Sequence, residues 1–140
     1  MSKRILYVED NPNNVLLVQR IVQAEGHHLL VAPDAAIGWA TAVAQQPDLI
    51  LMDLHLPGEL NGLELTQQIK QEPALQHIPI VALTAHDSAE VETAALAAGC
   101  SGFLRKPADL RQIRQALHIF LNGEGTAVTA QTASPTYTFI

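Results

Sequence analysis

The sequence has 140 residues, of which 48% are hydrophobic and 16% charged, so it has the length of one domain and enough apolar residues to form a core. Its formal net charge of -6 argues against a nucleic-acid-binding surface, which needs clustered lysine and arginine. One cysteine, Cys100, cannot form an internal disulfide and is expected to be a small buried residue of a cytoplasmic protein; no apolar run is long enough to span a membrane.

Five short, mainly apolar segments predict the strands of a β-sheet. Unbroken apolar runs of this length are typical of strands that helices cover on both faces, as in parallel sheets. The segments are residues 5–8, 29–31, 49–53, 79–84 and 102–104.

Amphipathic segments between and after these strands predict five helices. Three of them start at polar capping residues: Asn11 before Pro12, Asp34, and Asn61 with Glu64 three positions later. The expected inward-facing residues are Leu17, Val18, Ile21 and Val22 in the first helix, Trp39, Ala40 and Val43 in the second, Leu65 and Ile69 in the third, Val91, Ala94, Ala95 and Ala98 in the fourth, and Leu110, Ile113, Leu117, Phe120 and Leu121 in the fifth. The alternation predicts an α/β fold with a parallel sheet and right-handed crossovers.

Polar residues stand at the ends of four of these strands. Glu9 and Asp10 follow the first, Asp53 ends the third, Thr84 ends the fourth and Lys106 follows the fifth. Taken singly, each is typical of a cap or a turn. In a parallel sheet all of these strand ends lie at one edge, where three carboxylates repel each other unless a cation joins them. Mg²⁺ suits such oxygen ligands, and a carboxylate, a lysine and a hydroxyl beside it form a set that handles phosphoryl groups.

These motifs resemble the receiver domain of two-component response regulators over about residues 3–122. The matching segments are Glu9-Asp10 with Asn11-Pro12, Asp53 with Leu56-Pro57, Thr84-Ala85, and Phe103 with Lys106-Pro107. The resemblance implies a flavodoxin-like (βα)5 sandwich with strand order 2-1-3-4-5. One departure is that Gly62 stands nine residues after Asp53, where the family usually has eight, so the intervening loop is one residue longer.

The resemblance also implies a phosphorelay function and a set of roles. Asp53 accepts a phosphoryl group from a sensor histidine kinase or a histidine phosphotransfer protein. Mg²⁺ is held by Asp10, Asp53 and the backbone carbonyl of His55, with Glu9 acting through water. Lys106 and Thr84 bind the phosphoryl oxygens, and Thr84 and Phe103 form the switch. The output is binding of a downstream effector protein, and the face of the fourth helix, fifth strand and fifth helix also offers a surface for a homodimer.

Two histidines suggest a further hypothesis. His55 lies two residues after Asp53, and His86 two residues after Thr84. We expect both to border the path of the water that hydrolyses the aspartyl phosphate and so to modulate its lifetime; the alternative is that both are solvated loop residues.

The predicted receiver domain spans residues 1–123, and residues 124–140, rich in Thr and Ala, predict a flexible C-terminal tail. The alternative is a tail that docks on its own domain or on a partner through Tyr137, Phe139 and Ile140. Two other functions compete with a phosphoacceptor. A small phosphatase with Asp53 as nucleophile is disfavoured, because His55 stands where such enzymes place a second acid. A receiver-like scaffold without phosphorylation is disfavoured by the complete set of Asp10, Asp53, Thr84 and Lys106.

Overall fold

A computed structural model of the protein describes residues 2–55, 61–85, 89–106 and 110–122. In these residues five strands alternate with five helices. The strands are β1 (Arg4–Val8), β2 (His28–Ala32), β3 (Leu49–Asp53), β4 (Ile80–Thr84) and β5 (Gly102–Arg105). The helices are α1 (Pro12–Ala24), α2 (Ala35–Gln45), α3 (Gly62–Gln71), α4 (Ala89–Ala98) and α5 (Leu110–Asn122).

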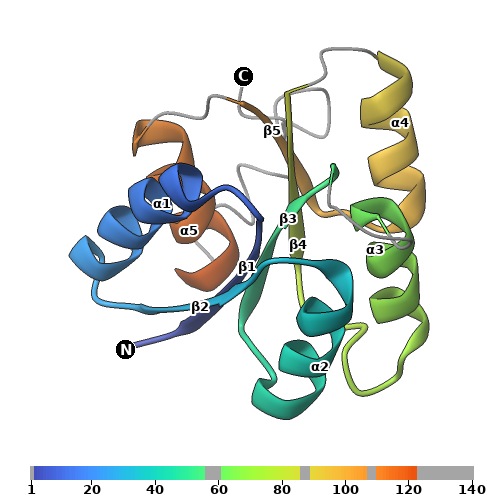
Figure 1. The fold of residues 1–140 in the computed structure, drawn as a ribbon, viewed down its shortest axis with the longest axis horizontal. Coiled ribbons are helices and arrows are strands. Elements are labelled where there is room, and N and C mark those ends of the chain that lie inside the picture. The colour runs from blue at the N-terminus through green and yellow to red at the C-terminus, as the bar shows by residue number, and fades with distance from the viewer. Residues whose placement is uncertain (1, 56–60, 86–88, 107–109, 123–140) are drawn as a thin grey trace.

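The strands form one parallel sheet in the order β2-β1-β3-β4-β5, which confirms the predicted flavodoxin-like fold. Helices α1 and α5 cover one face of the sheet and α2, α3 and α4 cover the other (Figure 1). Strand β3 is buried throughout, with Leu49 and Leu51 in the core cluster on the α1/α5 side and Ile50 and Met52 in the other. This central strand carries Asp53 at its end, so the surrounding layers fix the position of that carboxylate.

The predicted helix starts are confirmed by their capping hydrogen bonds. The Asn11 side chain accepts hydrogen bonds from the first turn of α1, and the Asp34 side chain accepts one from the backbone of Ile37. Asn61 and Glu64 form a reciprocal capping box at α3. Local side-chain chemistry therefore sets where these helices begin.

The buried faces of α1 and α2 differ from the prediction. Helix α1 buries Val18, Ile21 and Val22, but Leu17 is 37% exposed. In α2, Ala40 and Val43 are exposed and Trp39 is only partly buried, whereas the helix buries Ala35, Gly38 and Ala42.

The reason is the close approach of α2 to the sheet through small residues. A Cβ atom placed on Gly38 would lie 3.0 Å from Leu65 Cδ2 and 3.2 Å from Val8 Cγ2. Because the contact is made by a glycine and alanines, Ile37 and Val43 of α2 stay exposed, and Trp39 packs against the core only from a partly buried position. A pattern based on large hydrophobic residues therefore identifies the wrong face.

The remaining helices follow the predictions more closely. Leu65 and Ile69 of α3 are buried, and α4 buries the small residues Ala95 and Ala98. In α5, Ile113 and Leu117 are buried, but Leu110 is 49% exposed. None of the helices in the described part of the chain has the length and hydrophobicity needed to cross a membrane.

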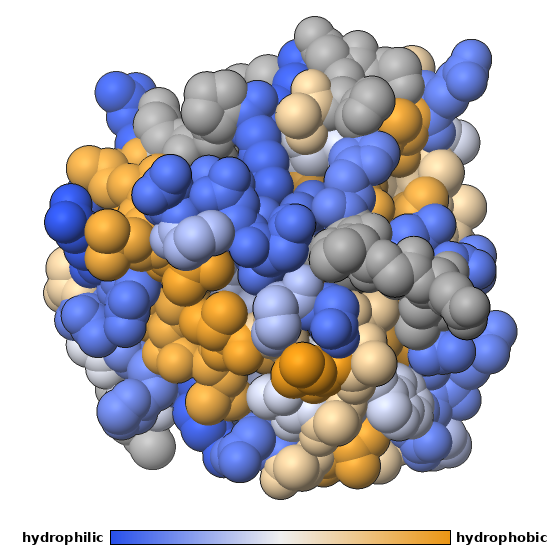
Figure 2. Space-filling model, viewed as in Figure 1, coloured by the Kyte–Doolittle hydropathy of each residue, from blue (hydrophilic) through white to orange (hydrophobic). Residues whose placement is uncertain are grey.

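Several large apolar side chains are exposed on α1 and on the edge strand β2. Leu16 of α1 is 47% exposed and Val31 of β2 is 42% exposed. Figure 2 shows hydrophobic surface over this side of the molecule. By contrast, Cys100 is buried as predicted, and burial raises the pKa of its thiol to about 11, so the thiol stays protonated at neutral pH.

Candidate functional site

The polar residues at the strand ends lie at the carboxyl edge of the sheet. Glu9 follows β1, Asp53 ends β3, Thr84 ends β4 and Lys106 follows β5. Glu9, Asp53 and Thr84 are 2%, 3% and 0% exposed. The edge therefore holds two buried carboxylates, and this is where open α/β sheets bind ligands.

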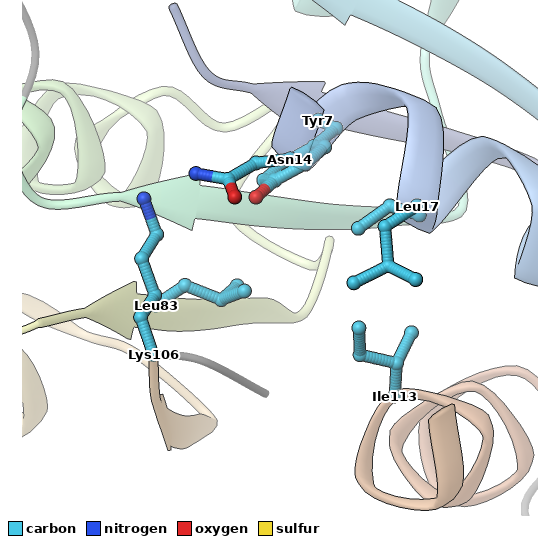
Figure 3. Close-up of a pocket in the computed structure, with 7 residues that line it drawn as sticks. Tyr7, Asn14, Leu17, Leu83, Lys106 and Ile113 are labelled. Carbon is cyan, nitrogen blue, oxygen red and sulfur yellow. The ribbon is translucent and has the colours of Figure 1, made fainter. Parts of the chain in front are cut away.

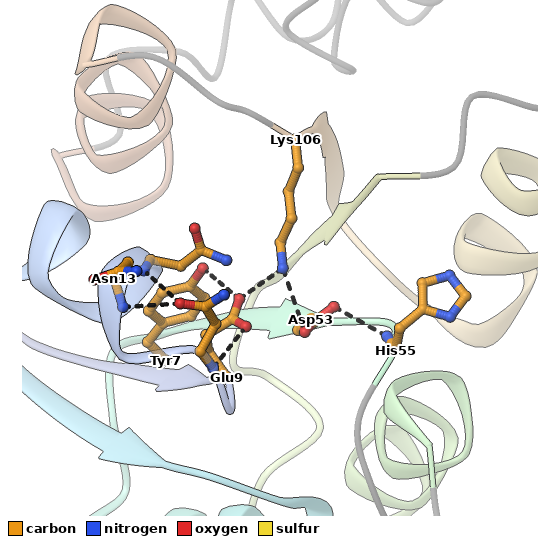
Figure 4. Close-up of polar contacts among 8 residues, drawn as sticks. Tyr7, Glu9, Asn13, Asp53, His55 and Lys106 are labelled. Atoms are coloured by element: carbon orange, nitrogen blue, oxygen red, sulfur yellow. Dashed lines mark hydrogen bonds and ion pairs between the residues drawn. The ribbon is translucent and has the colours of Figure 1, made fainter.

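Lys106 joins the two buried carboxylates. Its Nζ lies 2.7 Å from Glu9 Oε1 and 3.3 Å from Asp53 Oδ2 (Figure 4). The backbone N–H of Lys106 donates a hydrogen bond of 2.7 Å to the carbonyl oxygen of Thr84, which holds the backbone of Lys106 beside the end of β4. The structure therefore brings Glu9, Asp53, Thr84 and Lys106 together as the sequence predicts.

Glu9 has two further donors. The hydroxyl of Tyr7 donates to Oε1 at 2.8 Å, and the backbone N–H of Asn11 donates to Oε2 at 3.2 Å (Figure 4). Sequence analysis did not identify Tyr7 as part of the site. The signal was available, because Tyr7 is the one polar-tipped side chain in the apolar run of residues 5–8, and residues two apart on a strand share a side of the sheet.

Three acids are close enough to share a cation. One carboxylate oxygen each from Glu9, Asp10 and Asp53 lies within 4.8 Å of the others. Glu9 and Asp53 are buried, whereas Asp10 is exposed and leaves the cluster open to solvent. An all-oxygen donor set with a solvent-facing side fits a hard divalent cation that keeps some of its water.

The electrostatics of the two buried acids differ. Burial raises the pKa of Asp53 above its ordinary value, and the charge of Glu9 adds to this rise, although the backbone N–H of His55 and the ammonium of Lys106 oppose it. Burial also acts to raise the pKa of Glu9, but hydrogen bonds from Lys106 and Tyr7 bring it below its ordinary value. Burial and the nearby Glu9 carboxylate raise the pKa of Tyr7, so its phenol stays protonated and acts as a donor.

A stability prediction follows from the raised pKa of Asp53. The folded state favours the protonated acid, so the stabilisation it gives is present at low pH and is lost as pH rises through the folded pKa. At neutral pH without divalent cations, Asp53→Asn should raise the free energy of unfolding, because the amide removes the negative charge that burial and Glu9 disfavour at this position. The gain should shrink as the wild-type acid becomes protonated. Urea denaturation of the wild type and the variant at neutral pH and at an acidic pH tests this. A variant that is no more stable than the wild type at neutral pH would contradict it.

Thr84 and Phe103 are both inside the protein. Thr84 is fully buried at the end of β4, and Phe103, which is 1% exposed, belongs to the core cluster that includes Ala82 and Ala95 and packs against Val91. In the sheet Phe103 pairs with Ala82, two residues before Thr84. Their roles as a switch stay predictions.

The predicted modulating residues are partly outside the described residues. The backbone N–H of His55 donates to Asp53 Oδ1 at 3.0 Å, while its exposed imidazole lies on the far side of Asp53 from Tyr7 (Figure 4). His86, the Leu56-Pro57 motif and Pro107 lie outside the described residues. Ligation of a cation by the His55 carbonyl stays a prediction.

Gly62 lies directly against the end of β3. A Cβ atom on it would be 2.2 Å from the carbonyl oxygen of Asp53 and 2.9 Å from Cα of Leu54. No residue with a side chain fits there without moving the backbone. The first turn of α3 is thus held next to the Asp53 backbone, although the loop between them is one residue longer than the family pattern.

Comparisons with known proteins agree on the kind of domain. Residues 5–118 match the family model of the response regulator receiver domain. The polar-differentiation response regulator DivK of Brucella ovis is 32% identical over 121 residues, which cover 86% of this chain and 98% of DivK.

Two solved structures with bound metal are similar as well. One is the receiver domain of the sensor histidine kinase PA1611 from Pseudomonas aeruginosa PAO1, which has a magnesium ion coordinated in its active-site cleft. It is 30% identical to this chain, with a TM-score of 0.79, and the match covers 87% of this chain and 99% of that one. The Mn²⁺-bound response regulator Rcp1 is 29% identical with a TM-score of 0.74 and coverage of 84% and 93%.

Proposed function

The chain belongs to the family of response regulator receiver domains, and on this premise we propose that it accepts a phosphoryl group on Asp53 and signals by phosphorylation-dependent protein binding. The family identifies it as a signalling phosphoacceptor rather than a phosphatase or another catalytic enzyme, and it implies a histidine kinase as partner. The observation that carries the assignment to Asp53 is its place at the centre of the site, in contact with Lys106 and within 4.8 Å of two other acids.

The proposed step is a transfer between a phosphohistidine and a carboxylate. The donor is a sensor histidine kinase or a histidine phosphotransfer protein. One oxygen of the Asp53 carboxylate forms a bond to phosphorus, and the bond from phosphorus to the donor's imidazole nitrogen breaks. The electron pair of that bond stays on the nitrogen, which takes up a proton as it leaves.

We propose Mg²⁺ as the cation of the acidic cluster. Asp10, Asp53 and the carbonyl of His55 would hold it, and Glu9 would act through water. When bound it supplies positive charge next to the transferring group. The oxygen-only donor set supports this choice, and so do the bound Mg²⁺ and Mn²⁺ of the two similar proteins.

The remaining residues of the site would bind the phosphoryl group and change conformation when it is present. Lys106 and Thr84 would hold its oxygens, and Thr84 with Phe103 would form the switch. A phosphoryl group adds nearly two negative charges at Asp53, which is enough to bias an element with two arrangements. Helix α4, whose buried residues are alanines, is the element that we propose to respond. The face of α4, β5 and α5 would then bind the effector protein or a second copy of the chain.

His55 and His86 are proposed to set the lifetime of the aspartyl phosphate. The position of His55 two residues after the acceptor supports this. His55→Asn and His86→Ala should each change the half-life of the phosphorylated protein, and unchanged half-lives would remove the hypothesis.

The domain boundaries and the location are also proposals. Residues 1–123 would form the receiver domain, and the predicted tail of residues 124–140 lies outside the described residues. A cytoplasmic location is proposed because a single buried cysteine suits a reducing compartment.

Intact-mass measurement tests the proposed function. The wild-type protein is incubated with Mg²⁺ and a small acyl-phosphate donor, and in parallel with a phosphorylated histidine kinase. We expect a gain of about 80 Da, the mass of one phosphoryl group. An aspartyl phosphate loses this mass in neutral hydroxylamine, whereas a phosphate ester of serine, threonine or tyrosine retains it. A protein that gains no mass from either donor is not a phosphoacceptor.

A further inference from the structure

The hydroxyl of Tyr7 is a buried polar group that the proposed function does not use. The ring lies 1% exposed in the core cluster between the sheet and helices α1 and α5, where it packs among side chains such as Val18 and Ile113. A phenylalanine would satisfy this packing. What needs explaining is therefore the hydroxyl, because a buried hydroxyl is unfavourable unless it forms a hydrogen bond.

The surroundings of Tyr7 direct that hydroxyl to Glu9. A pocket of about 40 Å³ beside Tyr7 is lined mainly by apolar side chains, with Asn14 and Lys106 as its other polar members (Figure 3). The hydroxyl donates a hydrogen bond of 2.8 Å to Glu9 Oε1, the same oxygen that accepts from Lys106 at 2.7 Å. Tyr7 and Lys106 therefore act on one carboxylate oxygen.

The donors of Glu9 differ in what happens to them during phosphoryl transfer. Glu9 is 2% exposed and accepts from Tyr7, Lys106 and the backbone of Asn11. In the proposed function Lys106 turns to a phosphoryl oxygen and leaves Glu9. Without the tyrosine hydroxyl, the donors that the described residues give to this buried carboxylate would then fall to the backbone N–H of Asn11, beside the water that links Glu9 to the cation in the proposed function. Removal of a partner from a buried charge is strongly unfavourable.

We propose that Tyr7 is a positioning residue of the phosphoacceptor site, whose hydroxyl holds the Glu9 carboxylate in place so that Lys106 is free to turn from Glu9 to a phosphoryl oxygen. This inference rests on the proposed function. It gives Tyr7 of β1 a functional role, in addition to the roles of the two acids that follow the strand.

The first test is kinetic. Tyr7→Phe should lower the maximal rate of mass gain from the small acyl-phosphate donor by about tenfold at saturating Mg²⁺, and it should change the half-saturating Mg²⁺ concentration by less than about twofold. In a Glu9→Gln background the same change should have little further effect, because the hydroxyl acts through the charge of Glu9. Tyr137→Phe, the same substitution at the other tyrosine of the chain, is the control and should leave the rate unchanged.

The second test does not depend on phosphorylation. In a Tyr137→Phe protein labelled with ¹³C at tyrosine Cζ, Tyr7 gives the single labelled signal. Lys106→Met should shift this signal, because the oxygen that accepts from Tyr7 loses its other donor. A tyrosine that only fills space would not respond.

The outcomes separate the two proposals. Equal phosphorylation rates in the wild type and in folded Tyr7→Phe overturn the role of Tyr7 and leave the proposed function standing. An unshifted Tyr7 signal in Lys106→Met overturns the shared hydrogen bond on which that role depends. A wild-type protein without phosphoryl uptake overturns the proposed function and the inference together.

Discussion

Asp53→Asn should take up no phosphoryl group from either a small acyl-phosphate donor or a phosphorylated kinase. An amide oxygen is a poor nucleophile, whereas the two side chains have nearly the same shape and Lys106 keeps its 2.7 Å contact with Glu9. The variant should therefore fold and still lose the chemical step. Intact mass after incubation with Mg²⁺ and donor measures this, and the expected gain of about 80 Da should be absent.

Asp48→Asn is the matched control for this experiment. Asp48 precedes β3 at the opposite end of the strand, where its exposed side chain accepts a hydrogen bond of 2.9 Å from the backbone of Arg4. The same change of charge there should leave phosphoryl uptake at the wild-type level. A full mass gain in Asp53→Asn would show that another residue accepts the group, and peptide mapping would then identify it.

Removal of divalent cations should reduce the rate of phosphoryl uptake by about a hundredfold or more. Metal charge next to a transferring phosphoryl group contributes several kcal/mol to the stabilisation of the transition state. The same cation should stabilise the folded wild-type protein, because it joins three carboxylates whose oxygens lie within 4.8 Å of one another. Rates and melting temperatures with Mg²⁺ and with a chelator measure both effects.

Asp10 tests the composition of this cation site. It is the exposed member of the cluster, so Asp10→Asn removes a ligand with little disturbance of the core. The variant should need about tenfold or more Mg²⁺ for half-maximal uptake and should melt at nearly the same temperature with and without Mg²⁺. Asp48→Asn serves again as the control for charge. A wild-type dependence on Mg²⁺ in Asp10→Asn would exclude Asp10 as a ligand.

The fold was predictable because its signals are local. The strands are apolar runs, and the side chains of Asn11, Asp34 and Asn61 mark helix starts through hydrogen bonds within one turn. The buried face of α2 was not predictable in this way, since a glycine and alanines make its contact with the sheet while Ile37 and Val43 stay exposed. Size-based patterns cannot identify contacts that depend on close approach.

The site was predictable to the extent that topology determines it. Parallel strands bring Glu9, Asp53, Thr84 and Lys106 to one edge whatever the details of packing. Which contacts form within that edge depends on side-chain geometry, so the sequence did not reveal that Lys106 lies nearer to Glu9 than to Asp53. It did not reveal Tyr7 either, because an aromatic residue in an apolar strand is ordinarily interpreted as core.

The contact between Gly62 and the Asp53 backbone bears on how this chain can diverge from its relatives. The residues between them join two points that are already held together by packing, so added length changes the closure entropy only slowly and need not displace the acceptor. Residues inserted between positions 55 and 62 should therefore be tolerated while the chemistry is preserved, since they leave the contact of His55 with Asp53 in place. Position 62 differs, because any side chain there would meet the Asp53 backbone. In a library of variants of residues 54–62, Gly62 should therefore accept the fewest substitutions.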